Sequence, residues 1–299
     1  MNGALYLNDG MIAARQHNNR AALYTGHLKS IEDSMKNTLK QLFFIILLLS
    51  PLTGAGSDLG KEKRWSEQIV DSLLDGEAVQ LEAKGQKILG LYTPASNGST
   101  VRAAILLHGM GAHPDWPEVI NPLRSELPEH GWATLSVQMP VLANDAALTD
   151  YAPLFAEAGP RIESAVSFLQ EKGYEKIALI GHSLGAAMAA TYLGTSTKNI
   201  DGFVAIGLGI IDNDKMNALP ALAKIQLPVL DLYGSRDLDN VLATAPARAR
   251  AARKASNKNY RQQQIEGADH FFSGSQGILV RTVYGWLKRY FGPKSVTPK

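Results

Sequence analysis

The chain has 299 residues, of which 45% are hydrophobic and 19% are charged. This composition is typical of a globular protein that buries a sizeable core, and it excludes a fibrous or disordered chain. Cysteine is absent, which excludes disulfide bonds, thiolate catalysis and cysteine-ligated metals. The formal net charge of +2 is too small to indicate a nucleic-acid-binding protein.

The N-terminal part of the chain contains one strongly hydrophobic run, residues 41–49. This run is well short of the roughly 20 apolar residues that a membrane-spanning helix needs, and its length is typical of the core of a secretory signal. Lysines precede it and small residues follow it, so we expect a signal peptide over residues 35–55 that starts at Met35. Residues 1–34 contain no motif and no periodicity, and we interpret them as a non-native upstream extension.

The mature chain, residues 56–299, is predicted to be a single domain in the periplasm or outside the cell. The lack of cysteine agrees with an oxidising compartment. The residues before Gly56 carry five basic and three acidic side chains, so the mature chain has a formal net charge near zero. The alternative is an uncleaved segment that anchors the protein in a membrane by its N-terminus.

The first part of this domain is predicted to contain a helix and a hairpin. Residues 65–74 favour a short amphipathic helix that packs on the edge of a sheet. Residues 79–81 and 88–92 alternate between apolar and polar side chains, which predicts an antiparallel hairpin with one solvated face. Residues 93–100 follow as a loop rich in turn-forming residues.

From residue 103 onward the pattern changes to short apolar runs, each followed by a helical segment. Strands that are buried on both faces of a sheet have this composition, and their alternation with helices indicates a parallel sheet. The fold class is therefore α/β, with a mainly parallel central sheet, an antiparallel N-terminal hairpin and helices on both faces. The predicted strands are residues 103–107, 133–137, 177–180, 202–206, 229–233 and 260–265.

The loop after the first of these strands reads His108-Gly109-Met110-Gly111. Glycines at a strand end let backbone N–H groups turn inward, so the Met110 N–H is expected to form half of an oxyanion hole with the N–H of Leu184. We interpret His108 as a structural residue, with a catalytic role as the alternative. No spaced set of ligands recurs in this region, so no metal site is predicted.

Residues 176–195 predict a buried strand, a sharp turn and a helix, with Ser183 at the point of the turn. The motif Gly-His-Ser-Leu-Gly alone is weak evidence in a chain with 27 glycines, but the strand before it and the helix after it strengthen it. Glycines at positions 181 and 185 leave room for such a turn. Ser183 is therefore the candidate nucleophile.

Two further candidates follow later strands. Asp237 comes after the strand at 229–233, and His270 comes after the strand at 260–265. Active sites of open α/β sheets gather at the carboxyl ends of the strands, so we expect these residues to meet Ser183 there. His270 would take the proton of Ser183 and Asp237 would orient the imidazole. Asp239 is the alternative acid, and Asp231 is interpreted as structural.

The segment from about residue 78 to 291 resembles the α/β-hydrolase superfamily, and more closely an uncharacterised bacterial family within it. The resemblance rests on five motifs: His-Gly-Met-Gly (108–111), Pro-Asp-Trp (114–116), the run from 131 to 140, Gly-His-Ser-Leu-Gly (181–185) and Gly-Ala-Asp-His (267–270). The order serine, aspartate, histidine is that of the superfamily. Its members mostly hydrolyse esters and less often amides, so the resemblance implies a hydrolase with this triad.

Many lipases and peptidases of the superfamily insert a large cap after the sixth strand. Here only residues 207–227 separate the strands, and a helix at 218–224 must fit among them, so no large cap domain is expected. Residues 141–159 could form a small lid or a packed helix without substrate contact. Trp116, Leu154 and Phe155 are the tentative substrate-binding residues.

A run of basic residues without any acid follows Asp239. Its members Arg248, Arg250, Arg253 and Lys254 are interspersed with alanines, which predicts a surface helix. We interpret these side chains as a solvated face, and the alternative is a weak contact with an anionic membrane surface.

Taken together, these features predict a secreted or periplasmic serine hydrolase. It would cleave a carboxylic ester of short to medium acyl chain through an acyl-enzyme, without a cofactor. The alternatives are an amidase or peptidase-like serine hydrolase, and a non-catalytic binding protein with the hydrolase fold.

Overall fold

The computed structural model describes residues 56–292. The expected upstream extension, residues 1–34, and the expected signal peptide, residues 35–55, lie outside this range. Within residues 56–292, no helix is long and apolar enough to cross a membrane.

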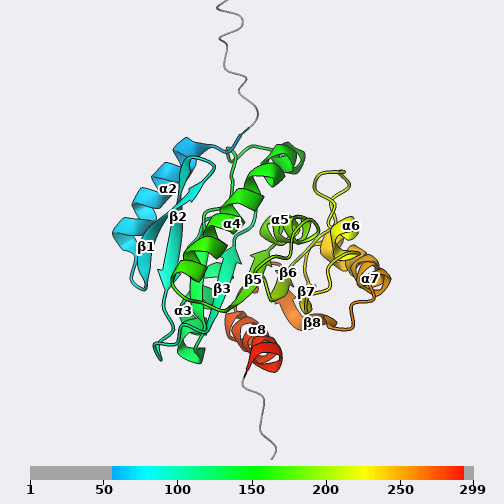
Figure 1. Ribbon diagram of the computed structural model, residues 1–299. Coiled ribbons are helices and arrows are strands. Elements are labelled where there is room, and N and C mark those ends of the chain that lie inside the picture. The colour runs from blue at the N-terminus through cyan, green and yellow to red at the C-terminus, as the bar shows by residue number, and fades with distance from the viewer. Residues whose placement is uncertain (1–55, 293–299) are drawn as a thin grey trace, which may run out of the picture. The chain divides into compact units, whose positions relative to one another are not determined.

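An eight-stranded sheet forms the centre of the domain, in the order β1-β2-β4-β3-β5-β6-β7-β8 (Figure 1). Strands β1 and β2 form an antiparallel hairpin, β2 pairs antiparallel with β4, and every later pair is parallel. The predicted fold class is therefore confirmed. The strands are β1 (Glu77–Ala83), β2 (Gln86–Thr93), β3 (Arg102–Leu107), β4 (Ala133–Val137), β5 (Lys176–His182), β6 (Gly202–Ile206), β7 (Val229–Arg236) and β8 (Tyr260–Asp269).

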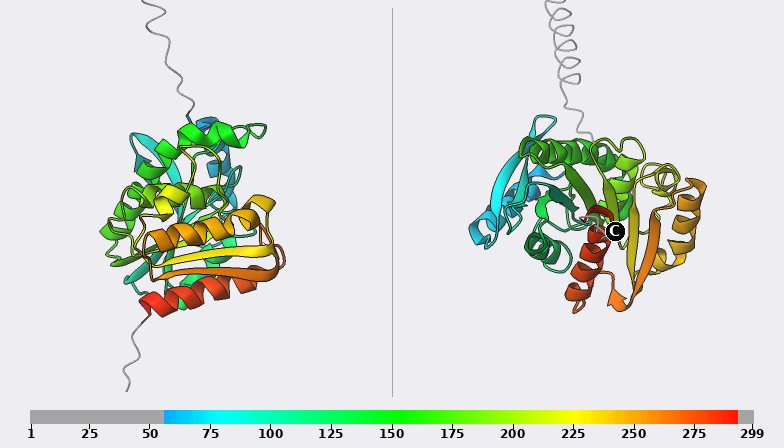
Figure 2. Two further views of the ribbon diagram at one scale, coloured as in Figure 1. Left: turned by 90° about the vertical axis from the view of Figure 1, so that its right-hand side faces the viewer. Right: turned by 60° about the horizontal axis from the view of Figure 1, so that its bottom comes forward.

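Helices cover both faces of this sheet. One apolar cluster joins the sheet to α4 and α5, and a second cluster on the other face joins it to α3 and α8. Figure 2 shows α7 and α8 on opposite faces of the β7–β8 end. The helices are α2 (Leu59–Ser72), α3 (Ile120–Glu126), η1 (Leu127–His130), η2 (Leu148–Leu154), α4 (Phe155–Glu171), α5 (Leu184–Leu193), α6 (Leu219–Leu222), α7 (Asp239–Lys254) and α8 (Gln276–Phe291).

The first helix and the hairpin differ from their predictions. Helix α2 begins at Leu59 instead of residue 65, because the Asp58 carboxylate caps it by accepting a hydrogen bond from the Lys61 N–H at 2.9 Å. Its Ile69 packs on Leu89 and Leu91 of β2. The prediction of one solvated face was therefore wrong for β2, since α2 covers one face of that strand and α4 the other.

Within residues 56–292, no large cap interrupts the fold. The connection between β6 and β7 contains only the short helix α6, which is briefer than the predicted helix at 218–224. The segment 141–159 contains both buried residues and residues exposed toward a cavity. Tyr151 and Leu154 are buried in the core below α4, as expected for a packed helix, whereas Leu148 is exposed and faces the cavity described below.

The interpretation of Arg248 as a surface residue was wrong. Its side chain is fully buried, and its Nε donates a hydrogen bond to the Asp231 carboxylate at 2.8 Å. Tyr260 and Gln262 donate to the same carboxylate oxygen. The expected contact with an anionic surface could therefore involve only the other three, Arg250, Arg253 and Lys254, which are exposed.

Replacing Arg248 with methionine should destabilise the protein by about 3–5 kcal/mol, because it leaves the Asp231 carboxylate buried without its cation. The matched change Arg250→Met on the exposed face of α7 should alter stability by about 0.5 kcal/mol or less. Urea denaturation measures both. Equal effects of the two changes would contradict the buried ion pair.

Candidate active site

Ser183 lies at a strained turn between β5 and α5. Its backbone angles are φ 54° and ψ −120°, a conformation that non-glycine residues rarely adopt. The turn can form because its neighbours are glycines: a Cβ on Gly185 would lie 2.4 Å from the His108 carbonyl oxygen, and one on Gly181 would lie 2.6 Å from the Ala186 Cα. The predicted strand, turn and helix are present here.

The structure brings Ser183, His270 and Asp237 together in a hydrogen-bonded chain. The Ser183 Oγ is 3.0 Å from the His270 Nε2, and the His270 Nδ1 is 2.6 Å from the Asp237 Oδ1. Strands β7 and β8 extend beyond their predicted ends, so Asp237 and His270 directly follow them. In this geometry the imidazole can donate from Nδ1 to the carboxylate and accept the serine hydroxyl at Nε2.

The surroundings of Asp237 favour its ionised form. Burial alone would raise its pKa, but hydrogen bonds from the His270 ring and from the N–H groups of Gly234 and Leu238 outweigh this effect and hold the pKa below its usual value. Asp239 is exposed at the start of α7 and forms no bond to His270. Of the two candidate acids, only Asp237 therefore contacts the imidazole.

The two predicted oxyanion donors lie beside the serine. Leu184 is the first residue of α5, and Met110 lies in the loop after β3. Within residues 56–292, neither N–H has a hydrogen-bond partner. A Cβ on Gly109 would lie 3.1 Å from the Ser183 Cβ, so the peptide that carries the Met110 N–H passes directly beside the serine.

A cavity of about 140 Å³ opens at Ser183 and His270. It is mainly apolar: among the described residues, Asn240 is the one polar side chain that lines it besides the serine and histidine. Trp116, Leu154 and Phe155 do not line it: Leu154 is buried in the core, Phe155 begins α4, and Trp116 packs on the cluster at α3 and α8. The apolar side chains that line the cavity are instead Met110, Leu148, Leu184, Ala187, Ile211, Leu238 and Val241.

Two residues that contact His270 were not predicted from the sequence. The His182 Nε2 lies 3.0 Å from the backbone oxygen of His270, and the two rings are 4.9 Å apart. A Cβ on Gly207 would lie 2.9 Å from the His270 Cε1, so only glycine leaves room for the ring. The position of Gly207 directly after a predicted strand was the available signal for it.

Burial keeps two further histidines neutral. Desolvation lowers the pKa of His108 to about 3 and that of His182 to about 4.

Within residues 56–292, no group of three or more histidine, cysteine, aspartate or glutamate side chains is placed to hold a metal ion. Nothing in the described site is therefore arranged as a metal centre.

The stability of the protein should fall as the pH drops from 7 to 5. Unfolded histidine binds a proton near pH 6.5, but His108 and His182 cannot do so while folded, so acid favours the unfolded chain. Each histidine should remove about 2 kcal/mol over this range. Urea denaturation at several pH values tests this: His108→Gln should remove its share of the pH dependence. An unchanged pH dependence in His108→Gln would contradict a neutral buried imidazole.

Comparison with solved structures shows the α/β-hydrolase fold. Est1E from Butyrivibrio proteoclasticus with bound ferulic acid is 15% identical, with a TM-score of 0.60 over 71% of this chain and 99% of that chain. A dienelactone hydrolase from Anabaena variabilis is 18% identical (TM-score 0.60, 72% and 97%), and an esterase from Pyrococcus furiosus is 18% identical (TM-score 0.59, 75% and 94%). These similarities establish the fold and nothing finer.

The comparison with curated proteins found no match. A family model described as "Protein of unknown function (DUF3530)" matches residues 57–160 and 155–289. These two segments cover most of the chain and include every residue of the site described above. The chain, which has the α/β-hydrolase fold, therefore belongs to this family.

Proposed function

We propose that the protein is a serine hydrolase that cleaves carboxylic esters through an acyl-enzyme. The observation that carries this proposal is the continuous hydrogen-bonded chain from the Ser183 Oγ through His270 to Asp237, at the floor of an apolar cavity. A serine hydroxyl is a weak nucleophile until an adjacent base takes its proton, and this geometry supplies that base.

In the first half of the proposed reaction, the Ser183 Oγ attacks the ester carbonyl while its proton passes to the His270 Nε2. The negative oxygen that forms accepts hydrogen bonds from the N–H groups of Met110 and Leu184. The Asp237 carboxylate stabilises the imidazolium. When the tetrahedral intermediate collapses, the bond to the alcohol breaks, and His270 gives its proton to the departing alkoxide.

The second half repeats these steps with water. His270 takes a proton from the water, whose oxygen attacks the acyl carbon, and the same two N–H groups receive the negative oxygen. Collapse of this intermediate releases the carboxylic acid and returns the proton to Ser183. No step needs a cofactor, because every proton is held by a residue of the site.

The small cavity favours short to medium acyl chains. Its volume of about 140 Å³ is below the roughly 300–1,000 Å³ of pockets that enclose drug-sized ligands. Each methylene that fits should contribute about 0.8 kcal/mol until the apolar lining is filled. The structural neighbours named as esterases support a carboxylic ester as the substrate.

We expect kcat/KM for nitrophenyl esters to rise from acetate to a short or medium chain and then fall, with ordinary saturation and no jump above the solubility limit. The measurement is a series of esters from acetate to palmitate, beside aminoacyl anilides. A maximum at palmitate would contradict the short acyl site, and preferential cleavage of the anilides would assign the protein to amidases.

Export to the periplasm or the exterior is part of this proposal. It is supported by the apolar run at residues 41–49 with its lysine flank. Because the signal is expected to be removed near residue 55, sequencing the N-terminus of protein recovered outside the cytoplasm tests it. A cytoplasmic protein that keeps Met1 would contradict export.

A further inference from the structure

His108 lies between two peptide groups and is bonded to both. Its Nε2 is 2.9 Å from the backbone nitrogen of Met139, and its Nδ1 is 2.9 Å from the Gly109 oxygen. A backbone N–H can only donate, so the Nε2 must be the acceptor and carries no proton. The neutral ring then has its proton on Nδ1, where it can donate to the Gly109 carbonyl.

The carbonyl that accepts this bond belongs to the peptide that carries the Met110 N–H. No peptide bond in the described residues is cis, so the Gly109 carbonyl and the Met110 N–H point in opposite directions within one rigid plane. Holding the carbonyl with the His108 Nδ1 therefore fixes the direction of the Met110 N–H. Because a Cβ on Gly109 would lie 3.1 Å from the Ser183 Cβ, this peptide lies close to the nucleophile, and its direction is set there.

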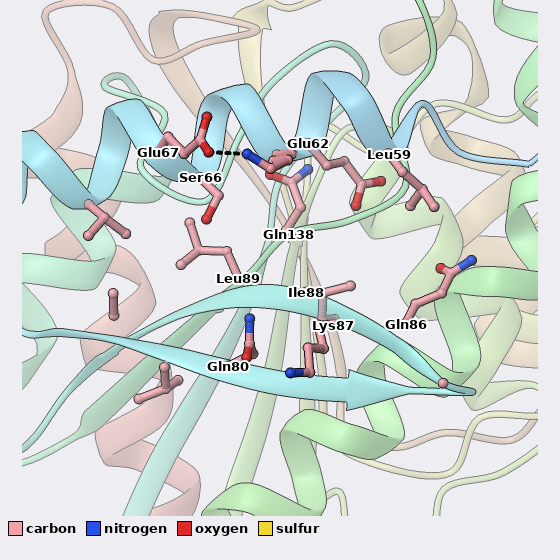
Figure 3. Close-up of a pocket in the computed structure, with 15 residues that line it drawn as sticks. Leu59, Glu62, Ser66, Glu67, Gln80, Gln86, Lys87, Ile88, Leu89 and Gln138 are labelled. Atoms are coloured by element: carbon pink, nitrogen blue, oxygen red, sulfur yellow. Dashed lines mark hydrogen bonds and ion pairs between the residues drawn. The ribbon is translucent and has the colours of Figure 1, made fainter.

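The other side of His108 is held by a buried ion pair. The Gln138 carbonyl, in the same peptide as the Met139 N–H, accepts a hydrogen bond from the Arg161 Nη1 at 2.9 Å. The Arg161 guanidinium in turn binds both carboxylate oxygens of Glu62 on α2, at 2.9 and 3.0 Å. Glu62 and Gln138 line a groove of about 730 Å³ between α2 and the hairpin (Figure 3), and Ser183 is not among the residues that line it.

These contacts form one continuous chain that alternates between side chains and peptides. It runs from Glu62 through Arg161 to the Gln138–Met139 peptide, and through His108 to the Gly109–Met110 peptide. Hydrogen bonds in such a chain polarise one another, and a charged group at one end strengthens the donors along it. Every side chain in it is more than nine-tenths buried, which limits competition from water for these bonds.

We propose that His108 is a positioning residue, which holds the Met110 N–H in the direction required to bind the negative oxygen of the reaction. This inference rests on the proposed function, because it assigns a role within the same site. It makes the interpretation of His108 as a structural residue specific, by naming the peptide that the ring holds. His108 itself does not touch the substrate.

Two substitutions at position 108 remove the two hydrogen bonds of the ring one at a time. Asparagine at position 108 keeps a donor near the place of Nδ1, whereas glutamine keeps an acceptor near the place of Nε2 and loses the donor. We expect His108→Gln to lower kcat by about 10- to 100-fold, since loss of an oxyanion donor costs about 100- to 1,000-fold and here the donor is only misdirected. His108→Asn should retain several-fold more activity than His108→Gln, and KM should change little in either.

The assay must distinguish a lower kcat per active site from a smaller amount of folded protein. The burst of nitrophenol counts the functional sites, so kcat is expressed per site, and His130→Gln, at an exposed histidine, is the control. A trifluoromethyl ketone that forms a tetrahedral adduct should lose affinity for His108→Gln in proportion to kcat/KM. Equal kcat per site in wild type and His108→Gln, or an affinity for the ketone that does not change, would overturn the proposal.

A measurement without substrate tests the inference separately. Nitrogen-15 NMR of the full chain with labelled histidine should show a neutral His108 ring protonated at Nδ1 at neutral pH, identified by the loss of its signals in His108→Gln. A ring protonated at Nε2 would overturn the proposal even in an active enzyme. A protein with the expected tautomer and no ester turnover would instead refute the proposed function.

Discussion

Replacing Ser183 with alanine should lower kcat for ester hydrolysis by about a million-fold, the loss seen when the serine of such a triad is removed. Without the Oγ no acyl-enzyme can form, and the residual rate comes from the oxyanion donors and the bound substrate alone. The fold should be unaffected, because the alanine side chain is that of serine without its hydroxyl group and fits the same space. Initial rates with a nitrophenyl ester measure the effect.

The matched control is Ser273→Ala, at an exposed serine three residues after His270. It should keep the wild-type rate, which would show that loss of an arbitrary serine near the site is harmless. A Ser183→Ala protein that retains more than about a hundredth of the wild-type kcat would place the nucleophile elsewhere, because the triad contributes far more than this.

Replacing Asp237 with asparagine should lower kcat by about 10⁴-fold. An asparagine amide can donate to the His270 Nδ1, which moves the ring proton to Nε2, and a protonated Nε2 cannot accept the serine proton. The geometry of the site should stay intact, since the two side chains have the same shape. The effect is therefore expected in kcat, with little change in thermal stability.

The matched change is Asp239→Asn, two residues further along the chain. Asp239 is exposed and forms no bond to His270, so this variant should keep kcat within about twofold, as expected for a surface substitution. The comparison is made with one ester at saturating concentration. If Asp239→Asn caused the larger loss, the acid would be Asp239, and the loop after β7 would have to rearrange in solution.

Much of the sheet could be predicted because its strands are short, apolar and bounded by turns. The predicted strands at 133–137 and 202–206 coincide with β4 and β6. The turn at Ser183 was also predictable, because the crowding at Gly181 and Gly185 restricts which residues can stand there. In these cases a local pattern determines the structure.

Other features depend on contacts that are distant in the sequence. The start of α2 was missed because its first turn is polar, although Lys61 and Glu62 are buried there by partners at Leu142, Asn144 and Arg161. The burial of Arg248 cannot be predicted from its own helix, because the carboxylate that pairs with it lies in a strand. A buried ion pair leaves no local sign in either segment that forms it.

The lining of the cavity was predicted least well. The prediction of Trp116, Leu154 and Phe155 rests on their size and apolar character, but these same properties suit residues that fill a core. The residues that line the cavity come instead from loops after several strands and from η2, α5 and α7, such as Leu148 and Ile211. These residues meet at one cavity because of the order of the strands in the sheet. That order cannot be read from any single segment of the sequence.

The central claim is that Ser183 is the residue that becomes acylated. The most direct test treats the purified protein with a fluorophosphonate, digests it and locates the adduct by mass spectrometry. We predict one adduct per chain, on the peptide that contains Ser183, and slow labelling of His270→Ala because its serine has no base to activate it. A folded protein that takes no label, or that is labelled on a different serine, would contradict the account.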